Sequence, residues 1–220
     1  MQYQDWLLLS IFWYGAMSKY PIIIFEGIET SGKTTNFKIA ANYLKKRRKT
    51  FIKLREPGGS IFSEKIRKLI LNKKLNLNNK TDLLLFYAGR SENFEKIIKK
   101  NYKKKIILID RFTDSTIAYQ HYGMKIDLKV IKMLNRFIIG NFDPDIIFLS
   151  TVNSKNLQKR LRNRSNLNRY DKFKLKFYNK VQNGYEKISS NKSKYIKINS
   201  NTNTINEVKK IIINKLEKLI

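Results

Sequence analysis

Residues 27–34 have the amino-acid types and the spacing of a phosphate-binding loop. Their sequence, Gly27-Ile28-Glu29-Thr30-Ser31-Gly32-Lys33-Thr34, fits the pattern G-x-x-x-x-G-K-[ST] without a mismatch. The two glycines let the backbone curl around a phosphate and present its N–H groups. We expect Lys33 to reach the β- and γ-phosphates of a nucleotide. An ordinary glycine-rich turn does not need Lys-Thr at this spacing, so Gly27 to Thr35 is our candidate nucleoside triphosphate site.

Two residues are candidate ligands of a Mg²⁺ ion. Thr34 would bind the metal through its hydroxyl, as the last position of this loop does. Asp110 follows an apolar stretch at 106–109. A carboxylate at the end of such a strand helps to hold the metal of phosphate-loop proteins, often through water. Asp110 could instead cap a helix, but beside the loop we favour the metal.

The inventory of reactive side chains narrows the chemistry further. The 220 residues contain no cysteine and one histidine, His121. Within this chain, disulfides, a cysteine nucleophile and multi-histidine metal sites are therefore excluded. Carboxylates, Lys, Arg, hydroxyls and backbone N–H groups remain. Phosphoryl transfer suits this set because it depends mainly on positioning and charge.

A formal net charge of +29 indicates an anionic partner without choosing one. Nucleotides, nucleic acids and phospholipids would all be attracted. Lys, Asn and Ile are all over-used, as expected when codons are pushed toward A and T. In that case many lysines are simply solvated surface residues.

The N-terminal residues are apolar from Trp6 to Tyr14. This stretch is too short to span a bilayer, which needs ~20 residues. No Lys or Arg precedes it, although a signal peptide begins with positive charge. We therefore expect no membrane association and a cytoplasmic location. The simpler hypothesis is that translation starts at Met17, so that residues 1–18 are an extension and residues 19–220 form a single domain.

Short apolar stretches alternate with helical patterns along the chain. The stretches that predict strands are 21–26, 51–54, 106–109, 146–149 and 195–198. The helical patterns are 33–48, 61–71, 81–100, 115–122, 127–139, 154–189 and 205–220. In the second helix, we expect one apolar side made of Ile61, Phe62, Ile66, Leu69 and Ile70.

The strand stretches are apolar throughout, so helices should cover both faces of their sheet. This predicts an α/β sandwich with a central parallel sheet. In such folds, ligands bind beyond the carboxyl ends of the strands. The phosphate-loop pattern and Asp110 both fall at such ends.

Three more motifs follow the predicted strands and helices. They are Arg55-Glu56-Pro57-Gly58-Gly59, Phe86-Tyr87-Ala88-Gly89-Arg90, and Asp110-Arg111-Phe112-Thr113-Asp114-Ser115-Thr116 with Ala118-Tyr119-Gln120. Together with the phosphate loop and an arginine-rich segment near residue 160, this set resembles the thymidylate kinase family in order and spacing. The resemblance runs from Lys19 to the C-terminus. Gly89 departs from the more usual Ala or Asn, and the N-terminal extension has no counterpart.

The resemblance implies the three-layer, P-loop NTPase-type fold of nucleoside monophosphate kinases. It also implies transfer of the γ-phosphate of ATP to dTMP, with Mg²⁺ as cofactor, and a homodimer. For the dTMP site, it implies that Phe86 stacks on thymine while Arg90 binds a thymine carbonyl. These two side chains are four residues apart and share a helix face. Taken alone, Phe86 would more often be a core residue.

The resemblance also implies roles at the phosphate and sugar of dTMP. Arg55 and Arg111 match arginines that grip the phosphate, although each could instead form a surface salt bridge. Glu29 matches a carboxylate near the 3′-hydroxyl, and Tyr119 matches a residue packed against the 2′ position. Polar positions near the thymine and sugar correspond to Thr116 and Gln120, either of which could be a helix-surface residue.

Residues 154–171 resemble the mobile lid of the family, with Arg160, Arg162, Arg164 and Arg169 as its arginines. Some members carry an arginine at the position of Thr30, and others place the catalytic arginine in the lid. Thr30 therefore indicates the second, bacterial type. We expect Arg164 to meet the transferring phosphate, backed by Arg160 and Arg169. The catalytic set would be Lys33, Arg111, Arg164 and Glu29.

Alternatives remain open at this point. The basic lid could be a solvated helix face or a nucleic-acid patch. The chain could be a kinase for another monophosphate, such as dGMP or UMP, or a nucleic-acid-binding protein with a vestigial loop. No separate nucleic-acid-binding module is visible in the sequence, so we expect no stable nucleic-acid partner.

Overall fold

The computed structural model describes residues 20–165 and 167–220. The expectations for an extension at 1–18 and for a start at Met17 lie outside these residues. In the part of the chain that the structure describes, no helix is long and apolar enough to cross a bilayer.

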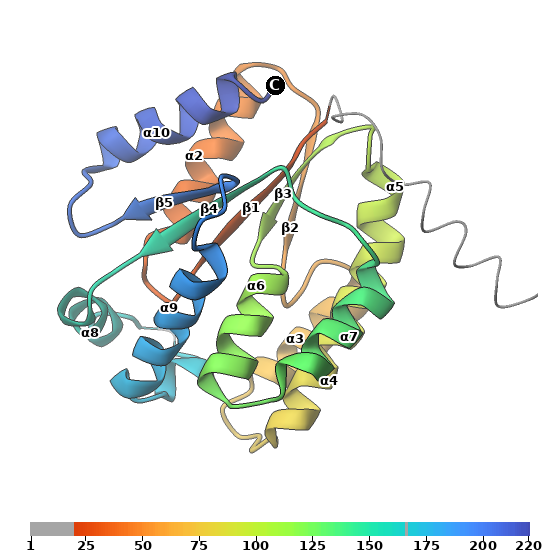
Figure 1. The fold of residues 1–220 in the computed structure, drawn as a ribbon, viewed down its shortest axis with the longest axis vertical. Helices are drawn as coiled ribbons and strands as arrows, with labels where there is room; N and C mark the ends of the chain where they lie inside the picture. The colour runs from red at the N-terminus through yellow and green to blue at the C-terminus, as the bar shows by residue number, and fades with distance from the viewer. Residues whose placement is uncertain (1–19, 166) are drawn as a thin grey trace, which may run out of the picture.

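One parallel sheet forms the centre of the fold (Figure 1). Its strands are β1 (Ile22–Gly27), β2 (Phe51–Arg55), β3 (Ile106–Asp110), β4 (Ile146–Thr151) and β5 (Tyr195–Asn199). They pair in the order β2-β3-β1-β4-β5, and every pair is parallel. All five strand predictions and the α/β class are therefore confirmed.

Helices cover both faces of this sheet. They are α2 (Lys33–Lys46), α3 (Ile61–Leu71), α4 (Asn79–Asn93), α5 (Lys99–Asn101), α6 (Thr113–Thr116), α7 (Leu128–Ile139), α8 (Ser154–Arg162), α9 (Leu175–Ser189) and α10 (Ile205–Glu217), with π-helical segments η1 (Phe94–Ile98) and η2 (Ile117–Gly123) and a 3-10 turn η3 (Tyr170–Lys172). On one face, α2 and α10 pack on the strands through Leu44 and Ile212. On the other, η1 and α7 contribute Ile98 and Ile139.

The carboxyl ends of the strands carry the polar residues that the motifs contributed. Arg55 and Asp110 are register partners at the ends of β2 and β3. Phe25, one residue before Glu26, is the partner of Asp110 on β1. A separate apolar cluster, with Tyr119 of η2, Leu157 of α8 and Tyr178 of α9, packs beyond these ends. The sheet and this cluster together enclose the edge where a ligand site was predicted.

The basic region at 154–189 is not the continuous helical region that the sequence predicted. It is divided into α8, η3 and α9, and residues 163–165 and 167–169 between α8 and η3 are not helical. Asn168 accepts a hydrogen bond from the backbone N–H of Tyr170 at 2.8 Å. Asn and Ser side chains compete in this way with helical bonding, and that competition explains the break.

The apolar side expected for the second helix was also partly wrong. Ile66 and Ile70 are buried, but Ile61, Phe62 and Leu69 are exposed, Ile61 to 85%. The pattern predicted the helix correctly, but it did not predict that only some of the apolar residues of the helix face the core.

Candidate active site

The loop between β1 and α2 has the shape that its glycines allow. Gly27 has φ +138°, and a Cβ at this position would lie 2.3 Å from the carbonyl oxygen of Ser150, so only glycine fits. Gly32 precedes α2 with φ +93°. The Ser31 hydroxyl donates to the carbonyl oxygen of Ile28 at 2.8 Å. The loop therefore ends at the N-terminus of a helix, where free N–H groups and the helix dipole favour a phosphate.

Lys33 opens α2 and reaches the end of β3. Its Nζ donates a short hydrogen bond to Oδ1 of Asp110. Burial, and next the positive charge of Arg111, lower the pKa of Lys33. Because a nearby anion favours the charged form of a lysine, a phosphate beside Nζ would oppose both effects.

Thr34 and Asp110 both line the cavity around this lysine. Mg²⁺ prefers oxygen ligands and is usually held by one or two carboxylates plus substrate phosphates. One hydroxyl and one carboxylate fit that donor set. Within residues 20–165 and 167–220, no three carboxylate or histidine side chains gather into a metal cluster. The hydroxyl of Thr34 and the carboxylate of Asp110 are the donor types expected for an ion that arrives with a nucleotide.

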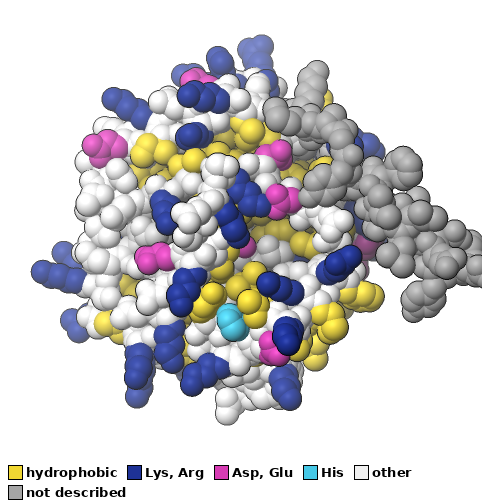
Figure 2. Space-filling view, viewed as in Figure 1, with side chains coloured by type: hydrophobic (Ala, Val, Ile, Leu, Met, Phe, Trp, Pro, Cys, Tyr) yellow, Lys and Arg dark blue, Asp and Glu magenta, His cyan; other side chains and the backbone are white. Residues whose placement is uncertain are grey.

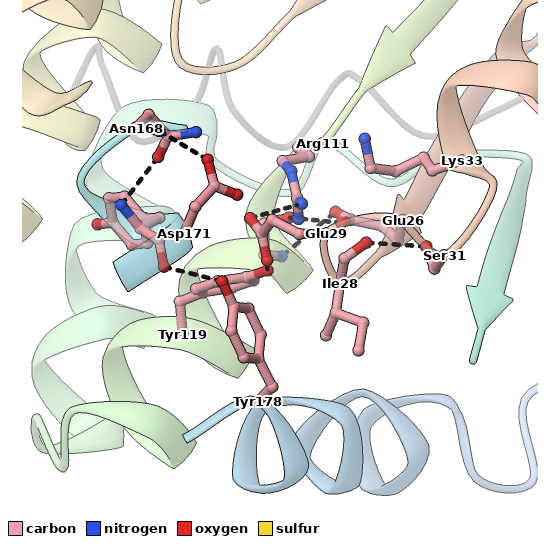
Figure 3. A network of polar contacts seen from close by, with 12 residues as sticks. Glu26, Ile28, Glu29, Ser31, Lys33, Arg111, Tyr119, Asn168, Asp171 and Tyr178 are labelled. Atoms are coloured by element: carbon pink, nitrogen blue, oxygen red, sulfur yellow. Dashed lines mark hydrogen bonds and ion pairs between the residues drawn. The ribbon is translucent and has the colours of Figure 1, made fainter. Parts of the chain in front are cut away.

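Arg111 lies at the centre of the site (Figure 3). Its backbone is left-handed, with φ 68°, which is a costly conformation for a residue with a Cβ. Nη2 donates to Oε1 of Glu29 at 3.1 Å, and Nη1 donates to the hydroxyls of Ser115 and Tyr185, both at 3.3 Å. The guanidinium carbon is 5.2 Å from the ring centre of Tyr119. Four elements thus hold one guanidinium in place.

Glu29 joins the phosphate loop to the neighbouring helix. One carboxylate oxygen pairs with Arg111, and the other accepts a short hydrogen bond from the hydroxyl of Tyr119. Tyr119 is on η2, and π-helical turns often occur at functional sites. The predicted residues Glu29, Arg111 and Tyr119 therefore meet in space, although Glu29 is far from the other two in the sequence.

Glu26 was missed by the sequence reasoning. It is fully buried at the end of β1. It accepts hydrogen bonds from the N–H groups of Phe112 and Ser115, at 2.8 and 3.3 Å, and from the Ser115 and Tyr185 hydroxyls, at 2.6 and 3.0 Å. These bonds fix the loop that presents Arg111. A carboxylate at the end of an otherwise apolar strand is the signal that could have revealed it.

Phe86 and Arg90, both on α4, line the cavity as well. The Phe86 ring meets the Tyr170 ring edge-on, with centres 6.1 Å apart. Arg90 is 2% exposed, with Nε bonded to Glu56 at 2.7 Å and Nη2 bonded to the carbonyl oxygen of Phe112 at 3.0 Å. Burial raises the pKa of Glu56, and the positive charge of Arg90 opposes that rise. A guanidinium has five donors, so Arg90 has donors left for a ligand.

Two further arginines border the cavity. Arg55 pairs with Glu64 at 3.1 Å, and half of its side chain is exposed. Arg67, which the sequence reasoning missed, donates to the carbonyl oxygen of Pro57 at 2.6 Å. Burial, and next the charge of Arg55, lower the pKa of Arg67. With Arg111, these guanidiniums make this side of the cavity a place for an anion.

The four predicted lid arginines have different surroundings. Arg160 donates to the carbonyl oxygen of Thr30 at 2.9 Å and also contacts Ser200. Arg164 pairs with Asp171, and Arg169 pairs with the buried Asp82. Arg162, at the end of α8, is exposed.

One cavity of about 580 Å³ joins these parts. Of the predicted residues, it is lined by Ile28, Glu29, Thr30, Ser31, Gly32, Lys33, Thr34, Thr35, Arg55, Phe86, Arg90, Asp110, Arg111, Thr116, Tyr119, Gln120 and Arg164. Gly27, Arg160, Arg162 and Arg169 are not part of its lining. The lining that the sequence reasoning missed includes Glu56, Arg67, Ser115, Asn168 and Tyr170.

Two hydroxyls of this lining lack partners. Among the described residues, Oγ1 of Thr30 and Oγ1 of Thr116 are the only buried side-chain polar atoms without a hydrogen bond. Leaving such an atom unsatisfied costs about 1–3 kcal/mol. A polar ligand in the cavity could satisfy both.

Comparison with known proteins gives one consistent result. The family model described as thymidylate kinase matches residues 25–212. A thymidylate kinase of Thermosipho africanus is 39% identical over 199 residues, which cover 89% of this chain and 98% of that protein. One from Staphylococcus epidermidis is 40% identical over 81% of this chain and 89% of its own length. The crystal structure of thymidylate kinase from Ehrlichia chaffeensis matches with a TM-score of 0.72 and 35% identity, covering 90% of this chain and 98% of that one.

Asp114 is a buried carboxyl close to the site, and its titration can be tested through the pH dependence of stability. Burial, and next the charge of Glu26, raise its pKa to about 7, and it accepts a hydrogen bond from Tyr195 at 2.7 Å. A carboxyl whose pKa is raised on folding takes up a proton between its unfolded pKa, about 4, and its folded pKa. Stability should therefore fall as pH rises through that window.

We predict that Asp114→Asn, which keeps an acceptor for Tyr195, removes this fall. Thermal unfolding measured from pH 5 to pH 8 should show the Tm of the variant rising relative to the wild type by several degrees. Parallel Tm profiles for the two proteins would contradict the assignment.

Proposed function

Since this chain belongs to the thymidylate kinase family and is an enzyme that phosphorylates dTMP, we propose that it transfers the γ-phosphoryl group of ATP directly between two substrates in the one cavity. A phosphate oxygen of dTMP would attack the γ-phosphorus while the bond to the β-phosphate oxygen breaks, giving dTDP and ADP. No covalent enzyme intermediate is needed. A cytoplasmic location stays a prediction.

The ATP side of the cavity would be the loop from Gly27 to Thr35. Backbone N–H groups would bind the phosphates, and Lys33 would move from Asp110 toward the β- and γ-oxygens. Mg²⁺, held through Thr34 and Asp110, would neutralise charge on those oxygens. Arg160, whose guanidinium bridges Thr30 and Ser200, would fix the edge of this site.

The dTMP side would begin at Arg111. Arg111 and Arg55 would bind the acceptor phosphate, since a planar guanidinium matches phosphate oxygens. Glu29, held by Arg111 and Tyr119, would accept from the 3′-hydroxyl. Phe86 would stack on thymine, with Arg90 as donor to its carbonyl.

Arg164 is the lid residue that we assign to the transferring phosphate. It lines the cavity, and its side chain is 37% exposed, so it can leave Asp171 for an anion. Such an arginine can be worth ~10³-fold in rate. The observation that carries this proposal is the shared lining of one cavity, which holds the phosphate loop with Lys33, several guanidiniums, the Phe86 ring and the unpartnered hydroxyls of Thr30 and Thr116.

The nucleic-acid alternative receives less support. Figure 2 shows Lys and Arg spread around the visible face instead of gathered into one stripe. That spread is typical of solvated surface lysines.

We predict a strong preference for dTMP over other monophosphates. Purified protein would be assayed with ATP, Mg²⁺ and dTMP, dUMP, dGMP, dAMP or UMP. Lys33→Met would serve as the control for contaminating kinases, because it removes the ammonium at the phosphates and should abolish turnover. Similar kcat/KM values for dTMP and dGMP would defeat the assignment.

Thr116 gives a sharper test of the thymine end. Thr116→Val removes a hydroxyl that has no partner within the protein, so the Tm should be unchanged or higher. If this hydroxyl binds dTMP, KM for dTMP should rise about 5- to 150-fold, the equivalent of the ~1–3 kcal/mol cost of an unmade buried hydrogen bond. Thr116→Ser keeps the hydroxyl and should stay near wild type. A Val variant with unchanged KM would remove Thr116 from the site.

We also propose a homodimer, with a second copy covering the α3–α4–α7 face. Exposed apolar side chains gather there, namely Ile61, Phe62, Leu69, Leu84, Val130, Met133 and Phe137. Phe137 is 84% exposed on α7, and hydrophobic side chains collect at that edge of the molecule (Figure 2). Such a patch on a soluble protein typically marks an interface.

Met133→Glu/Phe137→Glu should convert the dimer to a monomer, because burying two carboxylates against a second copy is unfavourable. Light scattering after size-exclusion chromatography would measure the mass. Ile205→Glu is the matched control, since Ile205 is also exposed but starts α10 on the opposite face of the sheet. A wild-type monomer, or a double variant that stays dimeric, would contradict this interface.

A further inference from the structure

Asp82 is a buried carboxylate to which the reaction assigns no role. It is on the first turn of α4 and is 1% exposed. One oxygen accepts a short hydrogen bond from Nη2 of Arg169. The other accepts a short hydrogen bond from the Tyr170 hydroxyl and a longer one, at 3.5 Å, from the Gln120 amide. A charge this deep is stable only with such partners.

Arg169 extends this contact to α3. Its Nε donates to the carbonyl oxygen of Ile70 at 2.8 Å, and its backbone N–H approaches the carbonyl oxygen of Leu71 at 3.4 Å. Its guanidinium also lies over the ring of Tyr170, 5.2 Å from the ring centre. Arg169 therefore joins the end of α3, the start of α4 and the approach to η3.

Tyr170 connects the same carboxylate to the cavity wall. Its ring meets Phe86 at 6.1 Å and Tyr119 at 5.8 Å, both edge-on. Its hydroxyl accepts from Gln120 at 3.2 Å, and its carbonyl oxygen accepts from the Tyr178 hydroxyl at 2.8 Å. The position of this ring, and so the shape of the thymine end, depends on the bond to Asp82.

The segment that carries Arg164 is tied to the same point. Tyr170 N–H donates to Asn168 Oδ1 at 2.8 Å, and Asn168 N–H donates to Asp171 Oδ2 at 2.7 Å. Asp171 also pairs with Arg164. A chain of contacts thus leads from Asp82 through Tyr170 to the arginine assigned to the transferring phosphate.

We propose that Asp82 is a positioning residue that fixes the thymine wall and the Arg164 segment together, through Tyr170 and Arg169. This inference rests on the proposed function for its kinetic effect. Arg169 then acts as the structural partner of Asp82 and not as a second arginine on the phosphate. A single buried carboxylate would make base binding and lid geometry depend on each other.

Because Asp82 and Arg169 form a buried ion pair, a double-mutant cycle can measure the contact between them. Removing one partner leaves the other charge buried and unpaired, whereas removing both can cost little more than removing one. Asp82→Asn keeps the shape but loses the charge, and its single acceptor oxygen cannot replace both carboxylate oxygens, which accept from Arg169 and Tyr170. Arg169→Gln removes the cation. The double variant completes a cycle whose non-additivity measures the contact.

We expect Asp82→Asn to raise KM for dTMP and to lower kcat, each by about 10- to 100-fold, since a small misplacement can cost that much. KM for ATP should change less than KM for dTMP, because Asp82 bonds directly to Arg169 and Tyr170, whereas the 27–35 loop is reached only indirectly, through Tyr119 and Glu29. The double variant should be no worse than either single variant. Asp143→Asn, which breaks the exposed pair with Lys194, is the matched control and should be neutral.

Hydrogen exchange on the nucleotide-free protein tests the contact without turnover. In Asp82→Asn and Arg169→Gln, peptides containing Asn168 and Tyr170 should exchange faster, while strands β1, β3 and β4 should not change. Faster exchange in the variants, together with a wild-type protein that lacks dTMP kinase activity, would contradict the proposed function but support the positioning role of Asp82. The inference would be overturned by unchanged hydrogen exchange or by an unchanged KM for dTMP in Asp82→Asn. It would also be overturned if the losses of activity caused by Asp82→Asn and Arg169→Gln added fully in the double variant.

Discussion

The site depends on holding one guanidinium, that of Arg111, where two anions can meet. Its left-handed backbone and its contacts with Glu29, Ser115 and Tyr185 come from separate parts of the chain. Backbone strain of this kind persists only when the surroundings over-determine it. Here the surroundings are the buried Glu26 and the parallel sheet, which bring the ends of β1 and β3 side by side.

Several cations at the site have a carboxylate beside them. Lys33 has Asp110, Arg90 has Glu56, and Arg164 has Asp171. These pairs keep a strongly positive cavity folded, since unpaired buried charges are costly. They also leave each cation able to exchange a carboxylate for a phosphate oxygen. Stability and anion binding therefore use the same groups, which preorganises the site for charge that develops during phosphoryl transfer.

The central sheet and the phosphate loop could be predicted from the sequence, because the strands are short apolar runs and the phosphate loop is a local pattern. Non-local features could not. Glu26 and Asp82 bond to partners far away in the chain, and the sequence does not show which residues those partners are. Arg169 was grouped with the lid arginines because all are basic, although its partner is the buried Asp82. The break after α8 depended on the Asn168 turn.

The most direct test is a crystal structure of the protein with ADP and dTMP bound together. The account predicts a dTMP phosphate oxygen within hydrogen-bond distance of Arg111, the thymine ring against Phe86, and the ADP phosphates on the loop that begins at Gly27. A dTMP molecule whose phosphate avoids Arg111, or whose base lies away from Phe86, would contradict it.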